Sequence, residues 1–185
     1  MTNHIISSDD LLKAILAMDA YNQGYDKVID HGETQIGNAT LGIQDVSAEA
    51  FSAGFYAVSY STNFGTVISY RGTDKWGNNP FTNTSGSDVP AFALGGGVWN
   101  VAQARLAAEF YQAVNGDSIA SSSTITLVGH SLGGGLAGFI GAIYQQDAVL
   151  FDNMPFEAAA QDAYDIASDS NVIFANENKL FQLVA

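Results

Sequence analysis

The stretch VGHSLGGGLAGF, residues 128–139, contains a serine in the setting that a nucleophile requires. Ser131 stands between two glycines in the core sequence GHSLG. This pattern between a strand and a helix holds the serine hydroxyl above the ends of the strands. Leu132 follows at the start of the expected helix, where its N–H is suited to stabilise an oxyanion. A chance match in a chain with 19 glycines is the alternative. The expected strand before it and helix after it favour the nucleophile.

A second candidate position follows another expected strand, in SYRGTD at residues 69–74. Catalytic crevices in α/β sheets lie at the carboxyl ends of the strands. The N–H and hydroxyl of Thr73 are therefore expected in the same crevice as Ser131, as an oxyanion donor. Taken alone, the stretch is better interpreted as an ordinary turn, with Arg71 as a surface or paired residue.

The hydrophobic pattern predicts the elements that must position these two stretches. Apolar residues at helical spacing and alternating or buried runs mark helices and strands, respectively. We expect helices at 9–22, 98–114, 131–146 and 155–167, a hairpin of strands at 54–60 and 65–70, and strands within 39–46 and at 123–129, 148–151, 171–176 and 179–185. Helices alternate with strands in the second half, which indicates parallel pairing. The predicted fold is a single α/β domain over residues 1–185, with a mostly parallel sheet flanked by helices.

The amino-acid composition argues against several classes of structure and function. The chain has 185 residues, of which 47% are hydrophobic and 14% charged, and this argues against disorder. A net charge of −13 with only six basic residues argues against binding to nucleic acid or to anionic membranes. There is no cysteine, so neither a disulfide nor a thiolate metal site is expected.

The N-terminal sequence MTNHIISSDD lacks the features of a secretory signal peptide. Apolar runs fall short of the roughly 20 residues that a membrane-spanning helix needs, so no transmembrane segment is expected. The compartment stays open, with an extracellular location reached without such a signal peptide as the working expectation.

YRGTD followed by GHSLGG about sixty residues later resembles the class 3 lipase family, a branch of the α/β hydrolases. The resemblance runs from about residue 51 to residue 155. It implies that Ser131 is the nucleophile and that Thr73 and Leu132 are the oxyanion donors. It also implies a lid over residues 75–95, whose alternative is a disordered surface loop. The implied reaction is hydrolysis of a carboxylic ester or lipid, with no cofactor and no metal, and no loop has a defensible calcium-ligand spacing.

The chain departs from this family after Ser131. DNMPF stands at 152–156 where the family has a turn of Gly-Ser-Pro type, and no histidine follows the serine to act as base. The His130 side chain is expected to point away from the serine hydroxyl and into supporting contacts. The family gives no role to His31, and His4 lies near the N-terminus.

The sequence also leaves more than one interpretation for the carboxylate that would orient the base. Asp152 follows a strand and is a candidate, although a turn or capping role is the stronger interpretation. The later acids are expected to be solvated on a helix face or at its end: Asp162, Asp165 and Asp169.

Two hypotheses remain for the whole chain. In one, it is the N-terminal part of a longer hydrolase, incomplete at its C-terminus and prone to self-association or to pairing with a C-terminal complement. The apparent stop inside a strand favours this hypothesis. In the other, it is a catalytically incomplete hydrolase-fold module that binds lipid or a partner.

Overall fold

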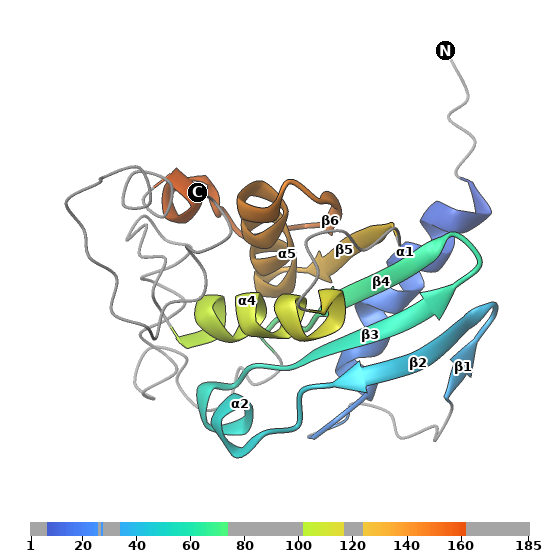
Figure 1. Cartoon of the computed structure of the whole chain (residues 1–185), viewed down its shortest axis with the longest axis horizontal. Helices are drawn as coiled ribbons and strands as arrows, with labels where there is room; N and C mark the ends of the chain where they lie inside the picture. Colours follow the sequence, from blue (N-terminus) through green and yellow to red (C-terminus); the bar gives the residue numbers. More distant parts are fainter. Residues whose placement is uncertain (1–6, 26, 28–33, 74–101, 117–123, 162–185) are drawn as a thin grey trace, which may run out of the picture.

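The computed structural model describes residues 7–25, 27, 34–73, 102–116 and 124–161 (Figure 1). A further helical stretch at residues 157–161 ends the described chain. The elements are, in chain order, α1 (Ser8–Asp19), the 3₁₀ helix η1 (Ala20–Asn22), β1 (Gln35–Ile36), β2 (Ala39–Gln44), α2 (Ala48–Ala53), β3 (Ala57–Thr62), β4 (Gly65–Tyr70), α4 (Ala102–Asn115), β5 (Ile125–His130), α5 (Leu132–Tyr144) and β6 (Asp147–Phe151).

The described strands form one open sheet in which the spatial order equals the chain order, β1-β2-β3-β4-β5-β6. Strands β1 to β4 pair antiparallel, whereas β4, β5 and β6 pair parallel. The α/β fold is thus confirmed, but the described sheet is partly rather than mostly parallel. The lengths of the connections explain this arrangement. The two-residue turn at 63–64 between β3 and β4 allows only antiparallel pairing, whereas α5 provides the long crossover that the parallel pair β5–β6 needs.

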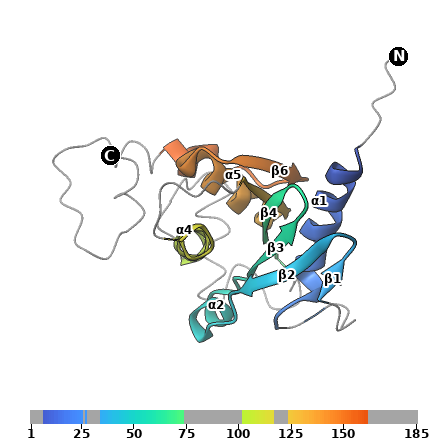
Figure 2. The ribbon, with the colours of Figure 1, turned by 45° about the vertical axis from the view of Figure 1, so that its right-hand side comes forward.

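Helices cover both faces of the sheet, with α1 on one side and α2, α4 and α5 on the other (Figures 1 and 2). Successive strand residues alternate between two apolar clusters. Val67 and Val128 pack with Leu16 of α1, while Ile68 and Leu127 belong to the larger cluster on the α4–α5 side. Each central strand is therefore buried on both faces.

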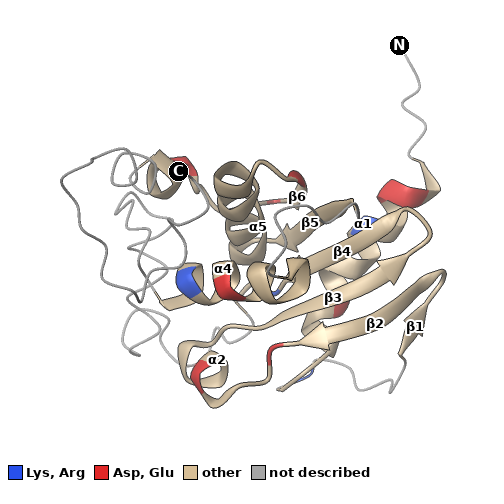
Figure 3. Ribbon diagram, in the orientation of Figure 1, with Lys and Arg blue, Asp and Glu red and all other residues tan. Residues whose placement is uncertain are grey.

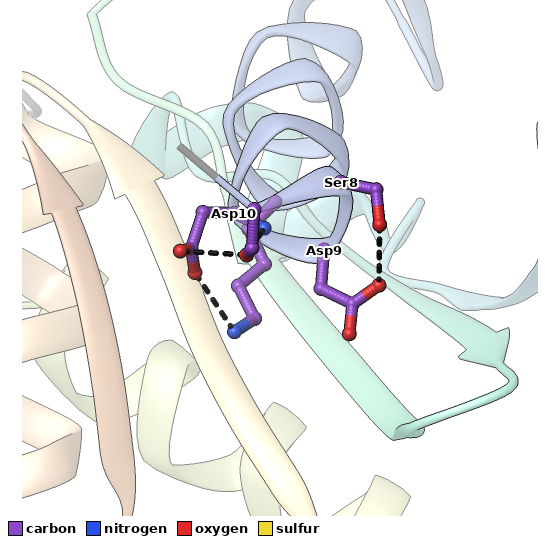
Figure 4. A network of polar contacts seen from close by, with 5 residues as sticks. Ser8, Asp9 and Asp10 are labelled. Carbon is purple, nitrogen blue, oxygen red and sulfur yellow. Dashed lines mark hydrogen bonds and ion pairs between the residues drawn. The ribbon is translucent and has the colours of Figure 1, made fainter. Parts of the chain in front are cut away.

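Local capping explains where α1 begins. The Ser7 hydroxyl accepts a hydrogen bond from the Asp10 N–H at 3.1 Å and donates one to the Asp10 carboxylate at 2.8 Å. Lys13 lies 3.4 Å from the same carboxylate, and Ser8 donates to Asp9 (Figure 4). The hydrogen bonds from Ser7 and Lys13 lower the pKa of the Asp10 carboxyl. The negative charge of Asp9 and Asp10 complements the helix dipole, and the predicted helix over 9–22 is confirmed as α1 and η1.

The hairpin is confirmed as β3 and β4, and the expected strands around residues 39–46, 123–129 and 148–151 are confirmed as β2, β5 and β6. The sequence pattern did not predict β1 or α2. Ser47 caps α2 by accepting from the Ala50 N–H at 3.1 Å, and left-handed Gly54 ends it. The expected strands at 171–176 and 179–185, the lid over 75–95 and the part of the 155–167 helix beyond residue 161 lie outside the described residues.

Charged residues are spread thinly over the described elements (Figure 3). Lys13 lies on α1, Arg71 follows β4, and Arg105 lies on α4, where it pairs with Glu109 at 2.8 Å and with Glu49 of α2. The part of the chain that the structure describes thus presents no cluster of basic residues. Within the same residues, no helix is long and apolar enough to cross a membrane.

Candidate active site

Ser131 forms the turn between β5 and α5, and its backbone is strained. Its φ is 56° and its ψ −124°, a conformation that non-glycine residues rarely adopt and that costs about 1–3 kcal/mol. Hydrogen bonds hold it there. The Ser131 N–H donates to the Phe151 carbonyl at 3.1 Å, and the Ser131 carbonyl accepts from Met154 at 3.0 Å and Gly135 at 3.1 Å. The end of β6 and the loop after it thus stabilise the strained turn from both sides.

The two glycines that flank the turn are required by close backbone contacts. A Cβ added at Gly133 would collide with the Tyr70 carbonyl oxygen, and one added at Gly129 would collide with the Gly133 carbonyl. The first turn of α5 therefore packs directly on the ends of β4 and β5. A side chain at either position would push the helix away and displace Ser131 with it.

Leu132 begins α5 and is almost completely buried. The N–H groups of a first helical turn have no acceptor within the helix, and the helix dipole favours negative charge beside them. Here the Gly135 N–H donates to the Ser131 carbonyl and starts the helical bonding pattern. The Leu132 N–H lies before that first bond, which suits it to an oxyanion.

The turn after β4 lies against the Ser131 turn. Strands β4 and β5 are parallel neighbours with Tyr70 opposite Gly129, so their chains leave the sheet at the same edge. A Cβ at Gly72 would lie 3.3 Å from the Ser131 Cβ and 2.6 Å from the His130 carbonyl oxygen. Thr73, which is half-buried, follows Gly72 directly. The structure therefore brings together the two stretches in which the sequence placed Ser131, Leu132 and Thr73.

The His130 ring belongs to a contact with the N-terminal part of the chain. Its Nδ1 lies 3.1 Å from the hydroxyl of Tyr21 in η1, and the two rings meet edge to face. This bond fits the expectation that the His130 side chain makes supporting contacts. His4 and His31 lie outside the described residues.

Asp152 follows β6 in an exposed, left-handed conformation with φ 44°. Its neighbour Phe151 lies opposite His130 in the sheet, so Asp152 is at the same sheet edge as Ser131. Aspartate tolerates this conformation in turns, which keeps both the turn and the acid interpretations open. Asp162, Asp165 and Asp169 lie outside the described residues.

Sequence reasoning missed two residues beside this site, Arg71 and Tyr25. Arg71 is only 2% exposed, so the surface alternative is wrong, whereas its contacts with Tyr25 support the alternative of a paired residue. Its Nη1 donates to the Tyr25 carbonyl at 2.8 Å, and its guanidinium lies 4.2 Å from the Tyr25 ring centroid and 4.9 Å from that of Tyr56. Burial raises the pKa of Tyr56 even though the Arg71 cation opposes that shift. An arginine directly after the β-branched and aromatic run at residues 65–70 was the available signal.

No group of three or more His, Asp or Glu side chains that could hold a metal ion occurs among the residues described. Comparisons of the chain with family models, with curated proteins and with solved structures find no match.

Proposed function

We propose that this chain is the nucleophile-bearing part of a serine hydrolase of the α/β-hydrolase type, related to the class 3 lipases. The observation that carries the proposal is the strained backbone of Ser131 in a strand–turn–helix. Strain of this kind persists only where surrounding contacts enforce it, and it clusters at functional sites. An ordinary capping serine would adopt an extended conformation, as Ser7 does before α1 and Ser47 before α2.

In the proposed reaction, the Ser131 Oγ attacks the carbonyl carbon of an ester. The negative charge that develops on the carbonyl oxygen is stabilised by the N–H groups of Leu132 and Thr73, with help from the Thr73 hydroxyl. The alcohol leaves, an acyl-enzyme remains, and water releases the acid. A base must take the Ser131 proton and return it to the leaving alcohol.

The proposed base and acid lie in polypeptide outside these 185 residues. No histidine follows Ser131 in the sequence, and His130 is bonded to Tyr21. Without a base, the serine hydroxyl is a weak nucleophile, and the loss of triad members costs about 10⁴–10⁶ in turnover. We therefore expect the chain alone to be a poor hydrolase.

The proposed substrate is an uncharged carboxylic ester or a lipid. The net charge of −13 opposes anionic substrates, and the four cations of the described residues are dispersed, with Arg71 buried.

Labelling with a fluorophosphonate probe tests the proposal. The chain is treated with the probe with and without added imidazole, which can replace a missing histidine base. We expect slow labelling that imidazole accelerates, and none in Ser131→Ala. Ser61→Ala, which removes an exposed hydroxyl from β3, is the matched control and should label as the unmodified chain does.

Two outcomes would overturn the proposal. Labelling that persists in Ser131→Ala would remove the assigned nucleophile. A folded chain that stays unlabelled with imidazole would favour the second candidate, a non-catalytic module that binds lipid or a partner. The absence of a histidine after Ser131 is the observation that favours this second candidate.

A further inference from the structure

We infer that residues 21–25, which we call the tyrosine clamp, form a positioning element for both halves of the active site proposed above. Tyr21 holds the turn that carries Ser131, and Tyr25 holds the arginine that begins the turn to Thr73. The inference rests on the proposed function for its catalytic meaning. Its structural content stands on contacts between a segment early in the chain and two turns that follow much later.

The first arm of the clamp is the Tyr21 hydroxyl. It lies 3.1 Å from the His130 Nδ1 and 3.5 Å from the His130 carbonyl oxygen. A Cβ added at Gly72 would collide with the same hydroxyl. One phenol oxygen therefore touches both turns, immediately before Ser131 on one side and immediately before Thr73 on the other.

The second arm is Tyr25. Its carbonyl accepts from Arg71 Nη1 at 2.8 Å, and its ring lies against the guanidinium at 4.2 Å. The Arg71 N–H in turn donates to the Tyr56 carbonyl at 3.0 Å. The Nη1 bond and the ring contacts hold a guanidinium that is only 2% exposed, so this arginine has little freedom to move. The backbone is thereby fixed two residues before Thr73.

Further hydrogen bonds connect the clamp to α1, to β3 and to the residues just before β3. Gln23 donates to the Asp19 carboxylate at 3.0 Å, and Tyr60 of β3 donates to the same oxygen at 2.7 Å. Asp19 is only 3% exposed. The Tyr25 hydroxyl also donates to the Phe55 carbonyl. The clamp is thus fixed to the sheet by contacts that do not involve either turn.

Precise positioning matters here because the two proposed oxyanion donors come from different segments. Leu132 belongs to the β5–α5 turn and Thr73 to the turn after β4, and no covalent link sets their spacing. Both N–H groups must lie within hydrogen-bond distance of one oxygen. A displacement of about 1 Å at such a site can cost about 10²-fold in rate. Tyr21 contacts both segments and Tyr25 contacts the segment that leads to Thr73, so together they maintain that spacing.

The test uses Tyr21→Phe, which removes only the hydroxyl. Tyr144→Phe is the matched control, because it removes a half-buried hydroxyl that also bonds a side-chain nitrogen, that of Gln112 at 2.9 Å, at the far end of α5. Two properties are measured on variants whose circular dichroism matches the unmodified chain. One is the rate constant for fluorophosphonate labelling in imidazole. The other is hydrogen exchange of the Arg71 and Ser131 amides, which are both hydrogen-bonded in the native turns.

We expect Tyr21→Phe to label about tenfold more slowly, which corresponds to the loss of about one hydrogen bond. We also expect faster exchange at the Ser131 amide, and Tyr144→Phe should change neither property. A second variant, Arg71→Lys, keeps the charge but loses the planar fork. It should speed exchange at the Arg71 amide and slow labelling, whereas Arg105→Lys on the exposed face of α4 should do neither.

Different results would refute the proposed hydrolase function and the tyrosine clamp. If the unmodified chain does not label, the proposed function fails, while the exchange rates still decide whether the clamp holds the turns. If labelling is normal in the unmodified chain, and both Tyr21→Phe and Arg71→Lys match it in labelling and exchange, the clamp is refuted and the hydrolase proposal stands.

Discussion

Replacing Ser131 by glycine should stabilise the protein while removing the proposed nucleophile. The residue has φ 56° and ψ −124°, a conformation that glycine adopts without penalty. The relief of strain is worth about 1–3 kcal/mol. Glycine also raises the conformational entropy of the unfolded chain, which lowers the free energy of unfolding by about 0.4–1 kcal/mol. The Ser131 side chain makes no capping hydrogen bond to α5, so its removal costs no such bond.

The net gain expected for Ser131→Gly over Ser131→Ala is about 0.5–2 kcal/mol, since alanine keeps the Cβ that causes the strain. For a domain of this size, 1 kcal/mol raises Tm by about 2–4 °C. Calorimetry or urea unfolding of the two variants measures the difference.

Ser61 provides a control at which the stability difference between the glycine and alanine variants should have the opposite sign. It is exposed in β3, and its φ is not among the positive values of the described residues. Ser61→Gly should therefore be less stable than Ser61→Ala by about 0.5–1 kcal/mol. If Ser131→Gly is no more stable than Ser131→Ala, the turn stores no strain, and the main support for the nucleophile is lost.

Two further predictions concern the oxyanion donors and the tyrosines. In a form of the protein with measurable esterase activity, Thr73→Ala should lower kcat by about 10²–10³ with little change in KM, because the hydroxyl acts on the transition state. A raised KM with unchanged kcat would instead make Thr73 a substrate-binding or turn residue. Burial raises the pKa of Tyr60 and Tyr70 far above the ordinary value of 10, and that of Tyr144 to about 12. Their contribution to stability is fully present below pH 10 and is lost as the pH rises above 10, by about 1.4 kcal/mol per pH unit for each fully buried tyrosine. Unfolding monitored by circular dichroism and tyrosinate absorbance between pH 9 and 12 should show the two changes together, and tyrosines that all ionise near pH 10 without unfolding would contradict the burial.

Local patterns predicted the elements with strong periodicity. The apolar spacing over residues 9–22 and the apolar run at 123–129 are signals within a few residues of the structure they form. α2 was missed because it has only six residues and no long apolar face, and β1 because it has two residues. Short elements form through tertiary packing rather than through their own sequence.

The candidate site could be predicted only in part, for a related reason. The motif placed Ser131 correctly in a turn because glycine spacing is a local signal. The contact of Tyr21 with His130 joins residues 109 positions apart, and no periodicity records such a pair. The burial of Arg71 depends in the same way on Tyr25 and Tyr56, which lie on other segments.

The identity of spatial and chain order in the sheet has a consequence for synthesis on the ribosome. Each new strand can add to the edge formed by the strand before it, so β1 to β4 can assemble from local hairpins while the rest is still being made. The clamp is among the first segments to emerge, yet His130 is translated more than a hundred residues later. Until β5 is synthesised, the nascent chain therefore contains the tyrosine clamp but not the turn that carries Ser131. A ribosome stalled before residue 125 would expose the apolar β4 edge, with Ile68 and Tyr70 uncovered, which makes this the stage at which aggregation is most to be expected.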